Sequence, residues 1–419
     1  MVISLVVASA SIAPTVLLSD REFRSLWRTP KSITWETLWL FGSGAVAIAF
    51  GAMVAIAAIP RYKPPTVEWP GLSGSSVRLL RRSSTVLTTL TLIGYAAFGF
   101  AIVRAGLNPF DLTSTYGEGL GIRDIVGTIP GVTTLTQFGI AAVVVSAILL
   151  TKAFSRIELY KLLAVVVLAS LRAFYFDERL AILELVVPIT VVVAASLSVK
   201  QGWRRRVLRF MPPVGLVAVI AIFGLFEYSR SWTYFRTHTS ESYLDFVLSR
   251  FAGYYATALN NGHLVLQHLD WPNRLPYDTI EAFWAAPGIE QADLYVRLGG
   301  HAEPYNRGTP SSLYDSMLYQ FGSPEFNNQS GYVGPFIDYG VVGGLIYFLV
   351  VGLIAGYLYR RFCRGDAFGL MFYPVVFVGL LEMPRYLYWA QGRTTYAWFG
   401  LLIVALLVSK SEAKARDGT

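Results

Sequence analysis

Ten apolar runs occupy nearly half of the sequence, and they constrain the fold more than any other feature. A helix of about 20 apolar residues is long enough to cross the hydrocarbon core of a bilayer. Only 15% of the residues are charged, whereas a typical soluble protein has about 25%. The sequence therefore predicts an all-α polytopic membrane protein with about 10 transmembrane helices. In chain order, the runs are Val2–Leu18, Thr37–Ile59, Thr85–Val103, Val132–Leu150, Ile157–Phe176, Leu180–Val199, Met211–Phe226, Pro335–Leu358, Phe368–Ala390 and Thr394–Val408.

The formal net charge of +8 lies mainly in short loops between these runs. Basic loops of membrane proteins stay in the cytoplasm, so this charge indicates helix orientation and not nucleic-acid binding. With the basic loop 200–209 in the cytoplasm, alternation of the runs puts the basic loops 61–82, 151–158 and 359–366 there too. We therefore expect a multi-pass protein with both termini in the cytoplasm.

In this arrangement the long polar segment Ser229–Asp338 is extracytoplasmic. It contains all four histidines and several arginines, but no lysine. Arginine forks bind phosphate oxygens in a bidentate way, so this composition favours an anionic partner. The predicted organisation is an N-terminal transmembrane bundle of about seven helices (1–228), an extracytoplasmic, partly helical loop domain (229–334), about three C-terminal transmembrane helices (335–409) and a cytoplasmic tail (410–419).

Apolar spacing predicts a helix over Ser240–Asn260, with Thr239 or Ser240 as its N-cap. An aliphatic stripe follows one face of this helix. A second stripe combines aromatic residues with an arginine, and its members are Tyr243, Phe246, Arg250 and Tyr254. Such a helix suits a position between packed helices and lipid headgroups.

Several arginines lie where predicted helices reach the outer face. A charge at that depth is costly and usually faces a bundle interior or a wet cavity. Each arginine alone is explained by snorkelling or an ordinary ion pair, as between Glu382 and Arg385, which are three apart on one predicted helix. Together they can instead converge on one anion pocket at headgroup level. They are Arg104, Arg172, Arg179, Arg230, Arg385 and Arg393.

Acid–base candidates gather near the ends of the outer segment. His238 follows Arg230 and Arg236 in SRSWTYFRTH, where the seventh run leaves the membrane, and it is the favoured catalytic candidate. A lone histidine is nevertheless more often structural. Asp338 is a second candidate, although an acidic residue at a helix start also interacts with the helix dipole.

No metal or other cofactor is expected. The outer segments contain no HExxH, CxxC or DxD motif, and His263 and His268 are five residues apart, one more than helical i, i+4 spacing requires.

Three stretches resemble the Wzy-type O-antigen or oligosaccharide repeat-unit polymerases. They are FYFDERLAILELVVP (174–188), SRSWTYFR (229–236) and FNNQSGYVGPFIDYGVVGGLIYFLVVGLIAGYLYRR (326–361). The resemblance implies a GT-C-related glycosyltransferase of the bacterial cytoplasmic (inner) membrane, acting in cell-envelope polysaccharide biosynthesis. Its substrates would be oligosaccharide repeat units linked to a polyprenyl pyrophosphate such as undecaprenyl pyrophosphate. Membrane lipid, a chain-length regulator and a flippase would be its partners, with no metal and no nucleic acid.

The resemblance also implies roles for particular residues. A histidine or carboxylate would take the proton of the acceptor hydroxyl, with His238 first and Asp338 second, beside Arg236 at the catalytic centre. The pyrophosphate would bind the remaining arginines, which are Arg172, Arg179, Arg230, Arg250 and Arg385. Sugar contacts would come from Asn327, Asn328, Gln329 and Tyr332. A turn before a glycine-assisted helix start is the favoured explanation of these last four residues.

Four other functions remain open at this point. A WaaL-type ligase uses the same donor and architecture but transfers to a lipid core. A metal-dependent GT-C transferase fits less well, because the first outer loop has only Asp20 and Glu22. A transporter or flippase predicts charged or broken helices at mid-membrane, whereas polar groups here gather at the outer edge. A scaffold of a polysaccharide assembly complex is the fourth.

The family pattern of two large outer loops is also only half present, since the second loop, Gly106–Gly131, is short.

Overall fold

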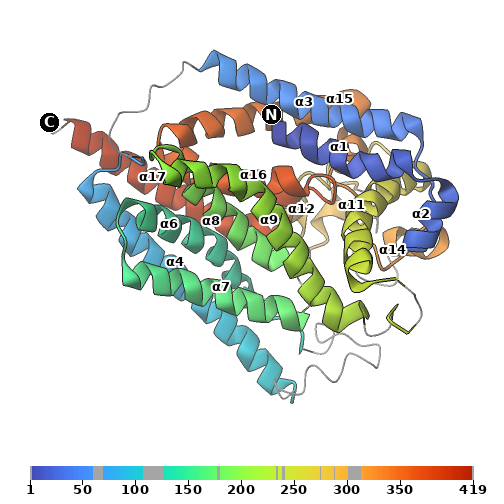
Figure 1. Ribbon diagram of the computed structural model, residues 1–419, viewed down its shortest axis with the longest axis horizontal. Coiled ribbons are helices and arrows are strands. Elements are labelled where there is room, and N and C mark those ends of the chain that lie inside the picture. Colours follow the sequence, from blue (N-terminus) through green and yellow to red (C-terminus); the bar gives the residue numbers. More distant parts are fainter. Residues whose placement is uncertain are drawn as a thin grey trace. The chain divides into compact units, whose positions relative to one another are not determined.

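The computed structural model describes residues 2–59, 69–106, 126–129, 131–176, 180–232, 235–237, 241–273, 275–286, 288–300 and 313–417. Over these ranges the chain forms helices and connecting segments, without a strand (Figure 1). Eight of the helices in these ranges are long and apolar enough to cross a membrane, or nine with the bent pair α1–α2. The prediction of an all-α polytopic membrane protein is therefore confirmed, and each of the ten apolar runs lies wholly or partly on a helix.

The helices of membrane-spanning length are α3 (Trp35–Ala58), α4 (Gly74–Arg104), η2 with α6 (Thr133–Gln137 and Phe138–Lys152), α7 (Arg156–Phe176), α8 (Leu180–Ser198), α9 (Trp203–Glu227), α15 (Val333–Cys363) and α17 (Thr395–Asp417). The others are α1 (Val2–Leu17), α2 (Asp20–Trp27), η3 (Tyr228–Trp232), α11 (Tyr243–His268), α12 (Glu281–Trp284), α13 (Leu294–Arg297), α14 (Leu313–Phe321), α16 (Ala367–Glu382), η4 (Tyr388–Ala390) and η5 (Gly392–Thr394).

The chain folds into two compact units. The first unit comprises Met1–Pro60, Glu241–Tyr357 and Gly379–Gly392. The second unit comprises Arg61–Ser240, Leu358–Val378 and Arg393–Thr419. These two units are defined by contacts between residues. The domain boundaries at 228, 334 and 409 were instead drawn from hydropathy, and they stay a prediction.

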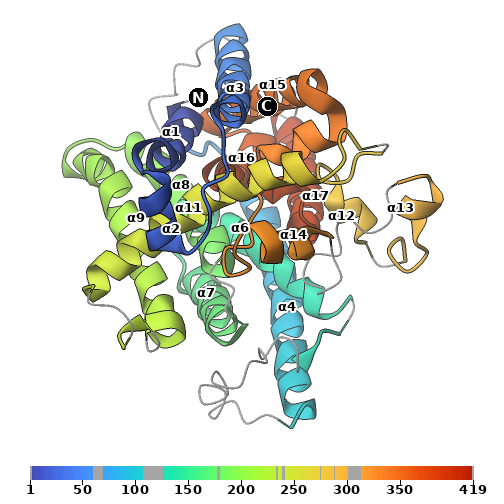
Figure 2. The ribbon, with the colours of Figure 1, turned by 90° about the vertical axis from the view of Figure 1, so that its right-hand side faces the viewer.

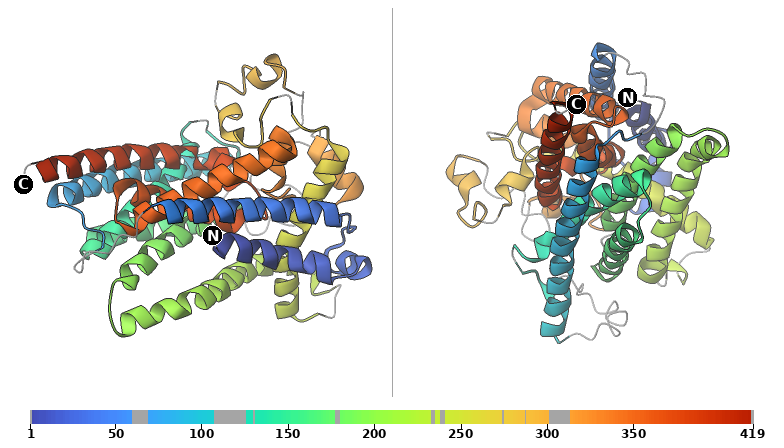
Figure 3. Two further views of the ribbon diagram at one scale, coloured as in Figure 1. Left: turned by 90° about the horizontal axis from the view of Figure 1, so that it is seen from above. Right: turned by 90° about the vertical axis from the view of Figure 1, so that its left-hand side faces the viewer.

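In the second unit, α4 packs against α6 and α17, and the right-hand view of Figure 3 shows α4 beside α17. Helix α6 is buried on every side from Gly139 to Leu149. One buried carboxylate, that of Glu158, accepts hydrogen bonds from Ser84 Oγ at 2.6 Å and Lys161 Nζ at 2.8 Å. Because a buried charge without partners is costly, these bonds explain how a glutamate is tolerated among apolar helices.

In the first unit, α1 and α3 lie side by side, as the left-hand view of Figure 3 shows. Helix α15 crosses α3 with backbones in contact, because glycines stand where they meet. A Cβ atom added to Gly356 would lie 2.9 Å from the Ala52 Cα, and one added to Gly352 would lie 2.9 Å from the Ile48 Cα. Larger residues at these positions would force the two helices apart.

Substitution Gly352→Ala should therefore destabilise the first unit by about 1–3 kcal/mol, because the new methyl group would overlap the Ile48 backbone. The measurement is the thermal midpoint of the purified protein, read by fluorescence-detected size exclusion. The matched control is Gly42→Ala on α3, where a Cβ meets no atom of the described chain within 4 Å. It should be neutral or stabilising by up to about 1 kcal/mol. Equal midpoints for the two variants would contradict the close crossing.

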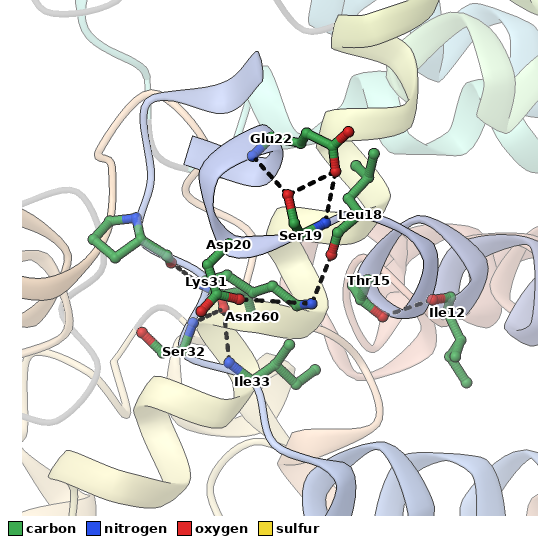
Figure 4. Close-up of polar contacts among 11 residues, drawn as sticks. Ile12, Thr15, Leu18, Ser19, Asp20, Glu22, Lys31, Ser32, Ile33 and Asn260 are labelled. Carbon is green, nitrogen blue, oxygen red and sulfur yellow. Dashed lines mark hydrogen bonds and ion pairs between the residues drawn. The ribbon is translucent and has the colours of Figure 1, made fainter. Parts of the chain in front are cut away.

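Helix α11 connects several parts of the first unit. Figure 2 shows it passing α1, α2 and α14, with which it is in contact. Its Asn260 Oδ1 accepts the N–H groups of Ser32 and Ile33 at 2.7 and 3.0 Å, and its Nδ2 donates to Pro30 O at 3.1 Å (Figure 4). Figure 4 also shows Lys31 Nζ donating to Leu18 O at 2.8 Å. The Asn260 side chain of α11 therefore holds the backbone of the link between α2 and α3.

The structure corrects the predicted ends of two helices. Helix α11 begins at Tyr243 with Ser242 as its N-cap, whose hydroxyl accepts the Asp245 N–H, so the prediction of Thr239 or Ser240 as the cap is wrong. Helix α16 ends at Glu382, eight residues before the predicted end of its apolar run at Ala390. Pro384 explains this early end, because a proline lacks an N–H donor and disfavours helical geometry in the residue before it. Arg385 therefore lies outside the helix, contrary to the prediction.

Candidate functional site

Two arginines and two aromatic rings form a continuous series in the first unit, which we call the arginine–aromatic row. Arg250 lies 5.3 Å from the ring centre of Phe326, and Phe326 lies 5.2 Å from Tyr254. Arg385 then lies over Tyr254 at 5.6 Å. Arg250 and Tyr254 are four residues apart on α11, so they share one face of the helix. The row brings together two of the arginines proposed from the sequence.

Arg385 is the less buried end of the row, with 18% of its side chain exposed. Its Nη1 donates to Glu382 Oε2 at 2.8 Å, and its guanidinium also lies over the rings of Tyr255 and Tyr386. Among the described residues, the buried Nε of Arg385 has no hydrogen-bond partner. Burial by itself would lower the pKa of Arg385, but the charge of Glu382 and the neighbouring tyrosines raise the pKa overall. The guanidinium therefore stays charged, with hydrogen-bonding capacity that its own neighbours do not fill.

Backbone pairing places Arg385 beside the loop that follows α14. Its carbonyl accepts the Ser330 N–H at 2.9 Å, and the Gly331 N–H donates to Met383 O at 2.8 Å. A side chain at Gly331 would overlap the backbone of Tyr386, so this approach requires glycine. The early end of α16 thus creates the loop that holds Arg385 in place.

Arg250 is almost fully buried, with 5% exposure, at the other end of the row. Its Nη2 donates to Glu325 Oε1 at 2.5 Å, and its guanidinium lies 5.5 Å from the Phe246 ring centre. Asn261, farther along α11, holds the neighbouring loop by donating to Phe326 O and Asn328 O. A paired, buried arginine of this kind positions the row and has little surface left for a ligand.

Asp338 is 4% exposed, and five hydrogen bonds to its carboxylate fill most of its acceptor sites. The donors are Asn273 Nδ2 at 2.9 Å, Tyr277 N at 2.8 Å, Asp278 N at 3.2 Å, Thr279 N at 2.7 Å and Thr279 Oγ1 at 2.7 Å. These bonds tie the start of α15 to the turn before α12. The geometry favours an anchoring role for Asp338, since a proton acceptor in catalysis needs a free lone pair facing the substrate.

The four predicted sugar contacts fall in different environments. Asn327 is exposed and Asn328 is half-buried. Gln329 is buried and donates to Asp278 Oδ1 at 2.7 Å. Tyr332 is fully buried and packs against Phe41 and Phe348, which gives it a place in the core. Only the two asparagines are accessible to a ligand.

The remaining predicted residues lie in the second unit or outside the described residues. Arg172 donates to Thr136 Oγ1 at 3.2 Å and lies 4.9 Å from the Phe98 ring centre. Arg236 is exposed. His238, Arg179 and the Arg230 side chain lie outside the described residues, so their assignments stay predictions.

Sequence reasoning missed several partners in the row. Glu325, Phe326, Tyr255 and Tyr386 were not among the expected site residues. The stripe of Phe246, Arg250 and Tyr254 was visible on α11, but Glu325, Phe326 and Tyr386 belong to non-helical segments. Such segments have no periodicity from which an orientation can be read.

Comparison of the chain with protein-family models, with curated proteins and with solved structures gives no match. Within the described residues, no group of three or more histidine, cysteine, aspartate and glutamate side chains is placed to hold a metal ion. The expectation of metal-free chemistry stays a prediction.

Proposed function

We propose that the protein polymerises oligosaccharide repeat units carried on a polyprenyl pyrophosphate, by metal-independent glycosyl transfer. In this proposal the arginine–aromatic row belongs to the extracytoplasmic face of the bacterial cytoplasmic membrane, and both termini are cytoplasmic. The basic loops support that orientation. The likeness of residues 174–188, 229–236 and 326–361 to Wzy-type polymerases supports the choice of reaction.

The observation that carries the proposal is the incomplete pairing of Arg385. One carboxylate and three aromatic rings hold its guanidinium in place, and its buried Nε has no partner among the described residues. A guanidinium has five N–H donors, and phosphate oxygens match its fork. In this proposal a phosphate binds the exposed part of the Arg385 side chain, 18% of which is accessible. Tyrosine rings beside it suit a position at headgroup depth, where one side is apolar and the other is wet.

The reaction requires charge stabilisation on the leaving group. The acceptor hydroxyl oxygen forms a bond to the anomeric carbon of the growing chain, while the bond from that carbon to the pyrophosphate oxygen breaks. The bonding electrons leave with the lipid pyrophosphate, and the hydroxyl proton passes to a base. Arg385 would offset the negative charge that develops on the pyrophosphate. A cation that is already in position stabilises developing charge most strongly where water is excluded. We retain His238 as the proposed base and Arg236 as its proposed cationic neighbour, and we assign Asp338 to anchoring.

Purified full-length protein, incubated with synthetic polyprenyl-pyrophosphate repeat units in EDTA, should produce a ladder of lengthening lipid-linked oligosaccharides on a gel. Because the leaving group is stabilised by arginine, EDTA should leave the rate unchanged. Transfer of one chain to a different lipid, without a ladder, would favour the WaaL-type ligase. Activity that appears only after manganese is added would favour a metal-dependent transferase. Absence of any transfer would overturn the proposal.

A further inference from the structure

A recess lies in the first unit, between the start of α3 and the end of α11. We call it the α3–α11 groove, and its volume is about 550 Å³. This volume is within the usual range of small-molecule sites, about 300–1,000 Å³. The groove is lined by Thr34, Glu36, Thr37, Leu40, His263, Leu266, Gln267 and Trp271. None of the residues of the arginine–aromatic row lines it.

Most of the polar groups in the groove are neutral. His263 Nδ1 is 2.8 Å from Thr37 Oγ1, so one ring nitrogen is engaged with α3. Burial lowers the pKa of His263, and the nearby His268 lowers it further, although a hydrogen bond with Gln267 and the charge of Glu36 oppose the shift. Neutral histidine, threonine and glutamine offer both donors and acceptors.

An aromatic side chain completes the groove. The indole Nε1 of Trp271 donates to Leu266 O at 2.9 Å, which fixes the ring at the end of α11. Since its only donor is engaged, Trp271 lines the groove with ring carbons. An apolar ring beside several donors and acceptors matches the C–H faces and hydroxyl edges of a sugar.

The charge of the groove distinguishes it from the row. Glu36 is the only charged residue among its described lining residues, and it disfavours an anion. The arginine–aromatic row carries two arginines, and these favour an anion. Eight residues separate Tyr255, beside Arg385, from His263 in the groove, or roughly 12 Å along α11 at about 1.5 Å per residue. The two sites are therefore separate along the helix, with the buried residues 256–262 of α11 between them.

We propose that the α3–α11 groove binds neutral saccharide units, contacting them through Gln267, His263 and Glu36 and packing them on Trp271. The assignment of these sugars to the lipid-linked substrate rests on the proposed function, but saccharide binding itself does not.

The test uses full-length protein in lipid nanodiscs, because glycoside detergents would compete for the groove. Its probes are an array of short hexose and N-acetylhexosamine oligomers without phosphate. We expect the protein to bind at least one of these oligomers. Gln267→Ala should weaken that binding about tenfold, the effect of one lost polar contact, and Trp271→Ala should weaken it more. Gln267 is exposed, so its variant should fold normally even if the loss of Trp271 disturbs α11.

Two controls separate saccharide binding in the groove from phosphate binding in the row. Asp270→Asn changes an exposed residue near Gln267 that does not line the groove, so binding should be unchanged. The double variant Arg385→Gln, Glu382→Gln should also bind the array normally, because the oligomers carry no phosphate. If polymer ladders fail to form while binding still depends on Gln267, the proposed function alone is wrong.

Three results would overturn the groove assignment. They are failure of the array to bind wild-type protein, equal binding by Gln267→Ala and wild type, and displacement of the bound oligomer by choline. Displacement by choline would identify the groove as a site for a cationic headgroup held by Glu36 and Trp271.

Discussion

Replacement of Arg385 by glutamine should reduce polymer formation about 10²- to 10³-fold, the usual effect of losing one group that stabilises transition-state charge. The same change leaves the buried Glu382 carboxylate without its counter-ion. Breaking a buried ion pair in this way costs about 3–5 kcal/mol of stability. The single variant should therefore lose both activity and folded protein, as measured by ladder intensity and thermal midpoint.

A double variant separates these two effects. Arg385→Gln with Glu382→Gln removes both charges, so most of the stability should return while polymer formation stays low. Arg297→Gln is the matched control, because Arg297 is an exposed arginine of the first unit that lies outside the row. It should leave the ladder within about twofold of wild type, as an exposed charge makes only a small contribution. Normal laddering by a folded double variant would remove Arg385 from the proposed site.

Replacement of Asp338 by alanine should destabilise the protein more than replacement of Gly352 or Arg385. It would remove the shared acceptor of the Asn273 amide, the Thr279 hydroxyl and three backbone N–H groups. Each buried unpaired donor costs about 1–3 kcal/mol, so the total should exceed about 5 kcal/mol. We expect little monodisperse protein from this variant on size exclusion.

Two milder changes calibrate this result. Tyr339→Phe removes one neighbouring hydrogen bond, between the tyrosine hydroxyl and Thr279 Oγ1, and should cost about 1 kcal/mol. Asp338→Asn keeps one acceptor oxygen and should give an intermediate thermal midpoint. If Asp338 is only an anchor, the asparagine variant should retain transfer activity within a few-fold of wild type at temperatures below its thermal midpoint. If the folded asparagine variant loses transfer activity by about 10²-fold or more, Asp338 is restored as the proposed base.

The fold was predictable because bilayer thickness sets the length of an apolar run. The ends of the helices were not, because local chemistry beyond the apolar core decides them. Helix α4 begins at Gly74, capped by the Ser73 hydroxyl, eleven residues before its predicted apolar start at Thr85. A basic stretch can continue a helix outside the hydrocarbon, and hydropathy does not detect that continuation. Pro384 was visible in the sequence, and it marks the end of α16.

The site was predictable only where a helix imposes spacing. The helix that carries Phe246, Arg250 and Tyr254 was expected to lie between packed helices and lipid headgroups. In the structure Phe246 and Arg250 are buried, while Leu244 and Leu248 are exposed. Burial of the aromatic face depends on the loop around Phe326, whose position depends in turn on Asn261. A contact between segments so far apart along the chain has no signature in the spacing of either one.

The bonds of Asn260 also set an order of events during synthesis. They join positions 227 and 228 residues apart, so the link before α3 leaves the ribosome long before its partner exists. At about 5–20 residues per second, the delay is roughly 10–45 s. Helices α1 and α3 must remain in the bilayer without their α11 contacts throughout that time. Nascent chains arrested before residue 260 should therefore expose this link to protease, and chains arrested well beyond residue 330 should protect it.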